Sequence, residues 1–166
     1  MIIAEGLSHE SVTIPAEVCR AAYGEDVYVT FRDSDITDER ADWIACCQCW
    51  PHRDECYSEQ FFLTLTLTDN RHTIGDSELK GEAPAQELRA GSLIVIDPGT
   101  VHWLSPPWSI FDQASQPSPW AAIQWQPSRE DAPAVARAIV EHYGGRWVDD
   151  IDPRYSSWRR GLEAAA

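Results

Sequence analysis

Two histidines and an aspartate, His52, Asp54 and His102, are the residues of this chain whose types and spacing point most directly to chemistry. Two imidazoles and one carboxylate on one face of a metal ion hold ferrous iron and leave positions open for oxygen and a substrate. Alternate residues of a strand point to the same side, so His52 and Asp54 can share one ion if the segment is extended. His102 ends another strand-like run and can complete the set across the mouth of a barrel.

Less specific explanations of these three residues stay open. A His-x-Asp pair also occurs by chance in solvated loops, and the Pro-Gly pair before His102 can simply connect two strands.

The run Cys46, Cys49, His52 and Cys56 has the ligand types of a structural zinc site. Against zinc, a strand over 42–50 would place Cys46 and Cys49 on opposite faces. The cysteines are therefore interpreted as small buried hydrophobic residues, and none has an identifiable group that would make it a nucleophile.

Composition limits the class of protein. The chain has 166 residues, of which 43% are hydrophobic, and this fits one domain with an ordinary core. Its net charge of −14 argues against nucleic acid as the main partner. We find no apolar run near the roughly 20 residues that span a bilayer and no signal-peptide pattern, so no membrane association is expected. Five cysteines, an odd number, then predict reduced thiols in a cytoplasmic setting.

Strand patterns dominate from about residue 26 to residue 126. Alternating or apolar runs predict strands, and the clearest one alternates leucine with threonine. A threonine face suits either solvent or a polar barrel interior. Most of the eight tryptophans are expected in the core, with one or two lining a pocket. The predicted strands cover 26–32, 42–50, 60–68, a short piece near Leu88, the run from Gly91 to His102, and 120–126.

Two helices are predicted after the strands. Residues 131–143 have an acidic start, a proline in the first turn and the stop signal Gly144-Gly145. Val135, Ile139 and Tyr143 fall on one helical face, which should pack outside the barrel. A second helix is expected over about 153–165. The sequence therefore predicts a single domain over 1–166, mainly β, with a barrel core and flanking C-terminal helices.

The His-x-Asp pair, the leucine–threonine strand and the run from Gly91 to His102 resemble the Fe(II)- and 2-oxoglutarate-dependent dioxygenases, especially the small prolyl-hydroxylase-like members. The resemblance covers roughly residues 42–126. It implies a double-stranded β-helix, the jelly-roll barrel that cupins share. It also implies that His52, Asp54 and His102 hold Fe(II), which with 2-oxoglutarate would hydroxylate a substrate.

One position departs from that family. Its members usually place an arginine or lysine on the strand after the second histidine, to pair with the far carboxylate of 2-oxoglutarate. No arginine or lysine occurs here between His102 and Arg129. If 2-oxoglutarate is used, the cation must come from elsewhere, and Arg71 and then Arg89 are the expected substitutes.

The same residues also resemble the two motifs of cupins. His52, Asp54 and Glu59 follow the first motif with aspartate in place of a histidine, and Gly91, Gly99 and His102 follow the second. This resemblance implies an Fe, Mn, Ni or Zn protein that does not use 2-oxoglutarate. The alternatives to the 2-oxoglutarate oxygenase are thus a cupin-type metalloprotein and a non-catalytic jelly-roll binding module. The expected partner is a small molecule or a protein side chain, which should enter near the loops at 69–90 and 105–119.

Overall fold

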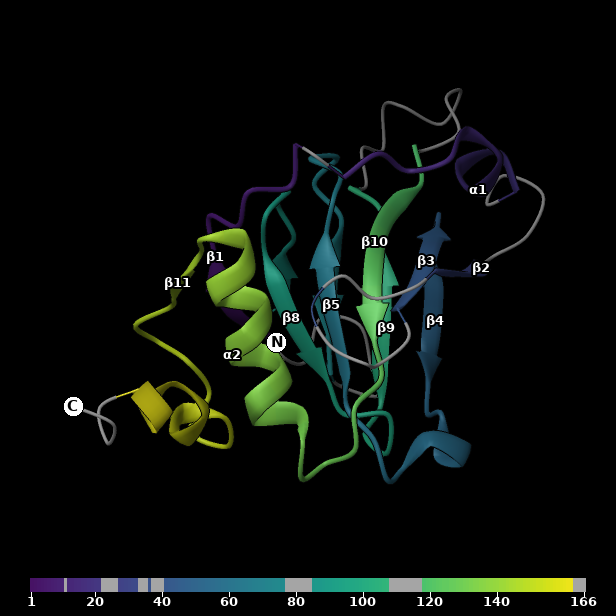
Figure 1. Ribbon diagram of the computed structural model, residues 1–166. Helices are drawn as coiled ribbons and strands as arrows, with labels where there is room; N and C mark the ends of the chain where they lie inside the picture. Colours follow the sequence, from purple (N-terminus) through teal and green to yellow (C-terminus); the bar gives the residue numbers. More distant parts are fainter. Residues whose placement is uncertain are drawn as a thin grey trace.

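The computed structural model describes residues 1–10, 12–21, 27–32, 36, 41–76, 85–107 and 118–162. Within these ranges the chain is mainly β, with two antiparallel sheets facing one another and helices outside them (Figure 1). The strands are β1 (Ile2–Glu5), β2 (Val27–Arg32), β3 (Ala41–Cys46), β4 (Cys49–His52), β5 (Phe62–Thr66), β6 (Thr73–Gly75), β7 (Gln86–Glu87), β8 (Leu93–Ile96), β9 (His102–Ser105), β10 (Trp120–Trp125) and β11 (Arg146–Trp147). The helical elements are α1 (Ala16–Ala21), η1 (Glu55–Tyr57), α2 (Ala132–Tyr143) and η2 (Ser156–Leu162).

The strand pairing defines a double-stranded β-helix. One sheet has the order β11-β1-β8-β5-β10-β3-β2 and the other β4-β9-β6-β7. Along the chain, β3 pairs with β10, β4 with β9, β5 with β8 and β6 with β7, always antiparallel. A two-stranded ribbon, closed at the β6–β7 end, therefore coils between the two sheets. This is the jelly-roll architecture, so the predicted fold class is confirmed.

The strand predicted over 42–50 is in fact two strands in different sheets. β3 ends at Cys46 in the larger sheet and β4 begins at Cys49 in the smaller one. The corner between them is held by hydrogen bonds: the Cys46 thiol donates to Gln48 O at 3.0 Å, and His72 Nε2 lies 3.0 Å from Cys47 O. The apolar alternation runs through this corner without interruption, so the sequence pattern does not mark it.

The leucine–threonine strand, β5, has core on both faces. Thr64 and Thr66 are fully buried in the barrel, where the Thr64 hydroxyl donates to Gln124 Oε1 at 3.1 Å. Leu63 and Leu65 are equally buried on the opposite face, under α2. The threonine face therefore points into a polar part of the barrel interior and not to solvent.

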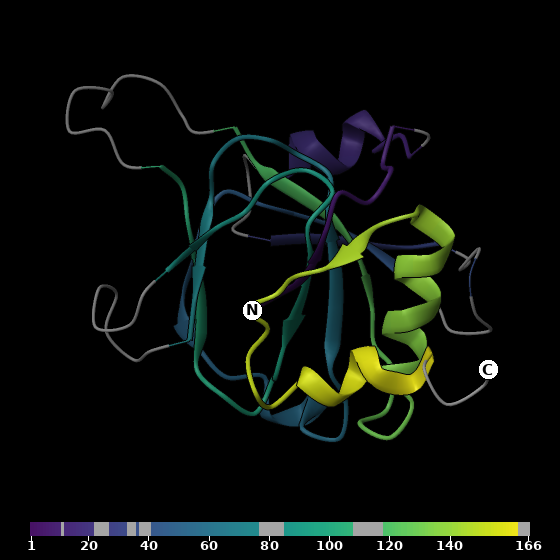
Figure 2. The same ribbon diagram turned by 90° about the vertical axis from the view of Figure 1, so that its left-hand side faces the viewer.

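Helix α2 covers the outer face of the larger sheet, as predicted. Val135, Ile139 and Tyr143 are all buried, and they pack with the outward-facing residues of β5, β8 and β10. Gly144 ends the helix in the left-handed conformation with φ 69°, which glycine adopts without strain. Figure 2 shows α2 and η2 together on this flank of the barrel.

The second C-terminal helix begins later than predicted. Residues 156–162 form the 3₁₀ helix η2, and residues 163–165 of the predicted span lie outside the described ranges. Trp158 of η2 is buried against Phe61 and Tyr155 in edge-to-face ring contacts. Of the helices in the described part of the chain, none has the length and apolar character needed to cross a bilayer.

Buried His72 should make the free energy of unfolding depend on pH. Burial lowers the pKa of His72, and this outweighs the opposing effect of its hydrogen-bond partners Cys47 and Asn70. A group whose pKa is lower in the folded state takes up protons more readily when unfolded, so stability falls as the pH drops below about 6.5. The free energy of unfolding of the metal-free protein, measured with urea, should fall less between pH 7.5 and pH 5.0 for His72→Gln than for the wild type. Equal losses would contradict this explanation.

Candidate metal centre

His52 and His102 lie directly opposite one another on neighbouring strands of the smaller sheet. β4 pairs with β9 so that Cys49 faces Leu104 and His52 faces His102. The step from Cys49 to His52 is three residues, whereas the step from Leu104 to His102 is two, so β4 contains a bulge. A bulge re-aims the side chains that follow it. Here it brings both Cys49 and His52 to the cavity side of the strand.

Asp54 reaches the two histidines from just beyond β4. The strand ends at His52, and Asp54 is the residue before η1. Its backbone N–H donates to Pro98 O at 2.9 Å, which ties it to the turn that leads into β9. The i, i+2 spacing of His52 and Asp54 predicted this proximity on one extended strand, but a turn anchored to Pro98 produces it.

The three predicted ligands converge. Asp54 Oδ2 is 3.6 Å from His52 Nε2 and 3.3 Å from His102 Nε2. One ligand atom from each residue lies within 4.8 Å of the others, and the two imidazole centroids are 4.4 Å apart. Donor atoms 2.0–2.2 Å from a common first-row metal would be separated by roughly 3–4 Å, so the group could hold a metal ion.

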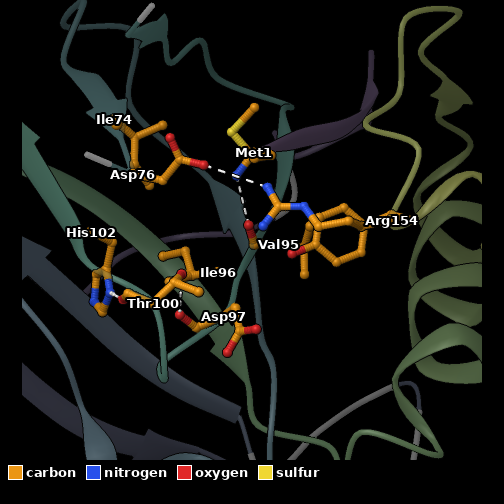
Figure 3. Close-up of a pocket in the computed structure, with 11 residues that line it drawn as sticks. Met1, Ile74, Asp76, Val95, Ile96, Asp97, Thr100, His102 and Arg154 are labelled. Atoms are coloured by element: carbon orange, nitrogen blue, oxygen red, sulfur yellow. Dashed lines mark hydrogen bonds and ion pairs between the residues drawn. The ribbon is translucent and has the colours of Figure 1, made fainter. Parts of the chain in front are cut away.

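Backbone carbonyls orient both imidazoles for this role. His52 Nδ1 lies 2.7 Å from Trp50 O, and His102 Nδ1 lies 3.0 Å from Thr100 O, in each case the carbonyl two residues earlier. A carbonyl only accepts, so each Nδ1 carries the proton and each Nε2 presents a lone pair toward Asp54. Metal-bound histidines are typically fixed in this way by their second nitrogen. Figure 3 shows the His102–Thr100 bond.

Burial favours the neutral form of His102. Its side chain is almost enclosed, and the cost of burying a charge lowers the pKa of His102, an effect to which the neighbouring His52 adds. The Thr100 carbonyl and Asp54 oppose the shift without cancelling it. A neutral imidazole is the form that binds metal, because the protonated ring has no free lone pair.

The triad opens onto a cavity of about 500 Å³ inside the barrel. This is the size of a small-molecule site, and such sites are mostly apolar with a few placed polar groups. Both sheets contribute to its wall. Its apolar and thiol lining comes from Ile44, Cys46, Cys49, Tyr57, Phe62, Ile74, Ile96, Trp103, Leu104 and Trp120.

A set of polar side chains crosses the larger sheet at this cavity. Asp42 on β3 is paired with Gln124 on β10, and Gln124 with Thr64 on β5; Gln126 follows just after β10. We call Asp42, Thr64, Gln124 and Gln126 the polar row. Asp42, Gln124 and Gln126 line the cavity, opposite the sheet that carries the two histidines.

The polar row was not predicted from the sequence. The sequence does contain an indication of it, because Asp42 and Gln124 are polar residues within otherwise apolar strand patterns. The strand patterns alone do not place the two residues side by side; the β3–β10 register does.

Cys46 and Cys49 line the same cavity. They belong to two strands, β3 and β4, so the prediction that they lie on opposite faces of one strand was wrong. Cys49 Sγ lies 3.2 Å from His52 Nδ1. Even so, the zinc site considered from the sequence does not form. Among the described residues, His52, Asp54 and His102 are the only group of three or more ligating side chains close enough to hold a metal, and it includes no cysteine.

Arg71 and Arg89 are placed away from the cavity. Both pair with Glu87, at 3.2 and 3.5 Å, and their side chains are 72% and 76% exposed. Arg129 is also engaged elsewhere: it binds Asp97 Oδ1 and Ser58 O, each at 2.6 Å. In the described part of the chain, no lysine or arginine lines the cavity. The lysine or arginine expected to pair with the far carboxylate of 2-oxoglutarate is therefore not found among the described residues that line the cavity.

Glu59, the additional cupin-type ligand, is exposed and does not join the triad. Trp103 lines the cavity and also packs against the neighbouring strand of the smaller sheet. It lies over Gly75 of the paired strand β6, where an added methyl group would collide with its indole ring. Residues 77–84 and 108–117 of the expected entry loops lie outside the described ranges.

No family model matches the sequence, and no curated protein sequence matches it. Solved structures do resemble it. A cupin domain of Cnp3 from Schizosaccharomyces pombe has a TM-score of 0.45 at 6% identity, covering 78% of this chain and 79% of that one. An uncharacterised double-stranded β-helix protein from Klebsiella pneumoniae has a TM-score of 0.43 at 11% identity, covering 85% and 100%.

A cupin-like protein from Thermotoga maritima has a TM-score of 0.40 at 14% identity, covering 81% of this chain and 83% of that one. Likenesses this weak say nothing about function. The assignment of the fold rests on the strand pairing of this chain.

Proposed function

We propose that this chain is a cupin-type mononuclear metalloenzyme that acts on a small organic molecule in its barrel cavity and does not use 2-oxoglutarate. The observation that supports this most is the arrangement of His52, Asp54 and His102. Two imidazoles held by backbone carbonyls turn their free nitrogens toward one carboxylate at the wall of a ligand-sized cavity.

Fe(II) is the metal that fits this donor set best. Two histidines and one carboxylate are the ligands of mononuclear non-heme iron sites with open positions, although Mn, Ni and Zn also accept such ligands. When bound, Fe(II) would supply positions at which oxygen and a substrate donor can meet. The protein's own contribution is to fix the Nε2 atoms, to hold Asp54 through its bond to Pro98, and to surround the site with apolar side chains.

The absence of basic residues from the described cavity lining favours this proposal over a 2-oxoglutarate oxygenase. A buried carboxylate without a cationic partner costs several kcal/mol, so 2-oxoglutarate would need a lysine or arginine in the cavity. Arg71 and Arg89 are committed to Glu87 at the surface.

An anaerobic titration of metal-free protein with Fe(II) tests the proposal. We expect one equivalent to bind, and subsequent 2-oxoglutarate to produce no visible charge-transfer band. His142→Ala, which removes an exposed histidine on α2, is the control and should bind like the wild type. If the protein bound neither Fe(II) nor any of Mn, Ni and Zn, the proposed metal centre would be contradicted. A charge-transfer band would restore the 2-oxoglutarate alternative.

A further inference from the structure

Gln124 engages only one end of its side-chain amide within the polar row. Its strand, β10, lies between β5 and β3 in the larger sheet (Figure 1). The Thr64 hydroxyl of β5 donates to Gln124 Oε1 at 3.1 Å. Thr64 is fully buried and is not among the described residues that line the cavity, whereas Gln124 is. The amide oxygen is therefore held toward β5, and the amide nitrogen is the end that Gln124 presents to the cavity.

The nitrogen of this amide is a donor in need of an acceptor. In the described part of the chain, no group accepts a hydrogen bond from Gln124 Nε2. The side chain is 8% exposed, so bulk water has little access to it. Gln126, the other glutamine of the lining, differs because its Nε2 donates to Asp42 Oδ2 at 2.7 Å. An enclosed donor without an acceptor costs free energy, so a ligand atom that accepts from Gln124 would bind favourably.

Trp120 adds a second donor to the wall that β10 forms. It lies four residues before Gln124, on the same face of the strand, and its side chain also lines the cavity. The indole is 5% exposed, and its Nε1–H has no hydrogen-bond partner within the described ranges. This wall therefore has more N–H donors than acceptors for them, and an oxygen-bearing ligand complements it.

The described lining favours a neutral oxygen acceptor over an anionic one. It contains no lysine or arginine, and a carboxylate buried without a cation is costly. A metal ion at the triad would pair with a carboxylate there, but Gln124 is on the opposite sheet. Neutral N–H donors suit a carbonyl oxygen, and the aromatic rings of Tyr57 and Phe62 suit the apolar remainder of a ligand.

We propose that Gln124 binds the neutral carbonyl oxygen of a small organic ligand, whose apolar part fills the cavity between the two sheets. Thr64 is the positioning residue, because its hydroxyl keeps the amide oxygen of Gln124 away from the ligand. A cavity of about 500 Å³ holds a molecule of this kind. The inference deepens the proposed function and rests on it in one respect, that the bound carbonyl compound is the substrate of the metal centre.

Three fluorinated probes of nearly equal shape test this carbonyl subsite. They are para-fluoroacetophenone, a ketone; para-fluoro-α-methylstyrene, in which a CH₂ group replaces the carbonyl oxygen; and para-fluorobenzoate, an anion. Fluorine NMR titrations with the metal-free full chain measure the three affinities. We expect the ketone to bind at least about fivefold more tightly than the styrene, the effect of one hydrogen bond to an enclosed donor. The ketone should also bind more tightly than the benzoate.

Gln124→Met keeps the approximate size of the side chain and removes its N–H donors. It should abolish the preference for the ketone and leave the affinity for the styrene nearly unchanged. Gln48→Met is the matched control, because Gln48 is not part of the described cavity lining, and it should alter none of the affinities. Should Gln124→Met fail to fold, Thr64→Val replaces it: this variant releases the amide oxygen of Gln124 and should reduce the preference for the ketone.

Three results would overturn the inference. The first is equal affinity of the wild type for the ketone and the styrene, and the second is tighter binding of the benzoate than of the ketone. The third is an equal effect of Gln124→Met and Gln48→Met on the preference for the ketone.

The outcome can be separated from the fate of the proposed function. A ketone preference that depends on Gln124, in a protein that binds no metal, would support the carbonyl subsite and refute the metalloenzyme. Metal binding at the triad without a ketone preference would do the reverse.

Discussion

Replacing His102 by alanine should weaken metal binding by more than about a hundredfold. Loss of a residue that merely orients a ligand typically costs 10–100-fold in metal affinity, and His102 is expected to be a ligand itself. Its almost enclosed side chain holds one of the two imidazole nitrogens that face Asp54. Competition with a chromogenic chelator, in Zn(II) and in anaerobic Fe(II), measures the change.

Two further variants sharpen this prediction. Asp54→Asn keeps the shape of the side chain but removes its charge, and it should also weaken binding strongly. Glu59→Gln removes an exposed carboxylate that lies outside the triad and should change nothing. If Glu59→Gln weakened binding as much as His102→Ala, the ligand set would have to be the cupin-like one that includes Glu59.

Leu65→Ala should lower the free energy of unfolding by about 2–5 kcal/mol. Leu65 is fully buried between the larger sheet and α2, and its loss leaves a cavity that the rigid sheet cannot fill. Urea unfolding of metal-free protein gives the value. Leu67→Ala is the matched control, since Leu67 is only partly buried at the margin of the same cluster, and it should cost clearly less.

This pair of variants also separates folding from the site. Leu65 faces α2 and not the barrel interior, so Leu65→Ala should keep its metal affinity at temperatures where it is folded. A cost below about 1 kcal/mol for Leu65→Ala would contradict the packing of α2 on this sheet.

Much of the fold could be predicted because local pattern and tertiary packing agree. Helix α2 follows its apolar stripe, and β2, β5, β8 and β10 follow their alternating or apolar runs. The corner at Cys47 and Gln48 could not be predicted, because apolar residues continue on both sides of it. Strand β1 was not predicted either; this short strand is held in the larger sheet by pairing with β11 on one side and β8 on the other.

The candidate site was predictable in its residues and less so in its geometry. The residue types and their spacing in the sequence identified His52, Asp54 and His102 as candidate metal ligands, because few kinds of side chain bind metals. The bulge in β4 and the hydrogen bond from Asp54 to Pro98 depend on partners far along the chain. The expected roles of Arg71 and Arg89 rested on proximity in sequence to the barrel strands, and their pairing with Glu87 directs both side chains elsewhere.

A crystal structure of the iron-loaded protein, with anomalous diffraction at the iron edge, would show whether His52, Asp54 and His102 hold one metal ion. We expect one strong anomalous peak per chain. It should lie about 2.0–2.3 Å from His52 Nε2, His102 Nε2 and an Asp54 carboxylate oxygen. A peak bound by other residues, or no peak in protein that was given stoichiometric Fe(II), would contradict it.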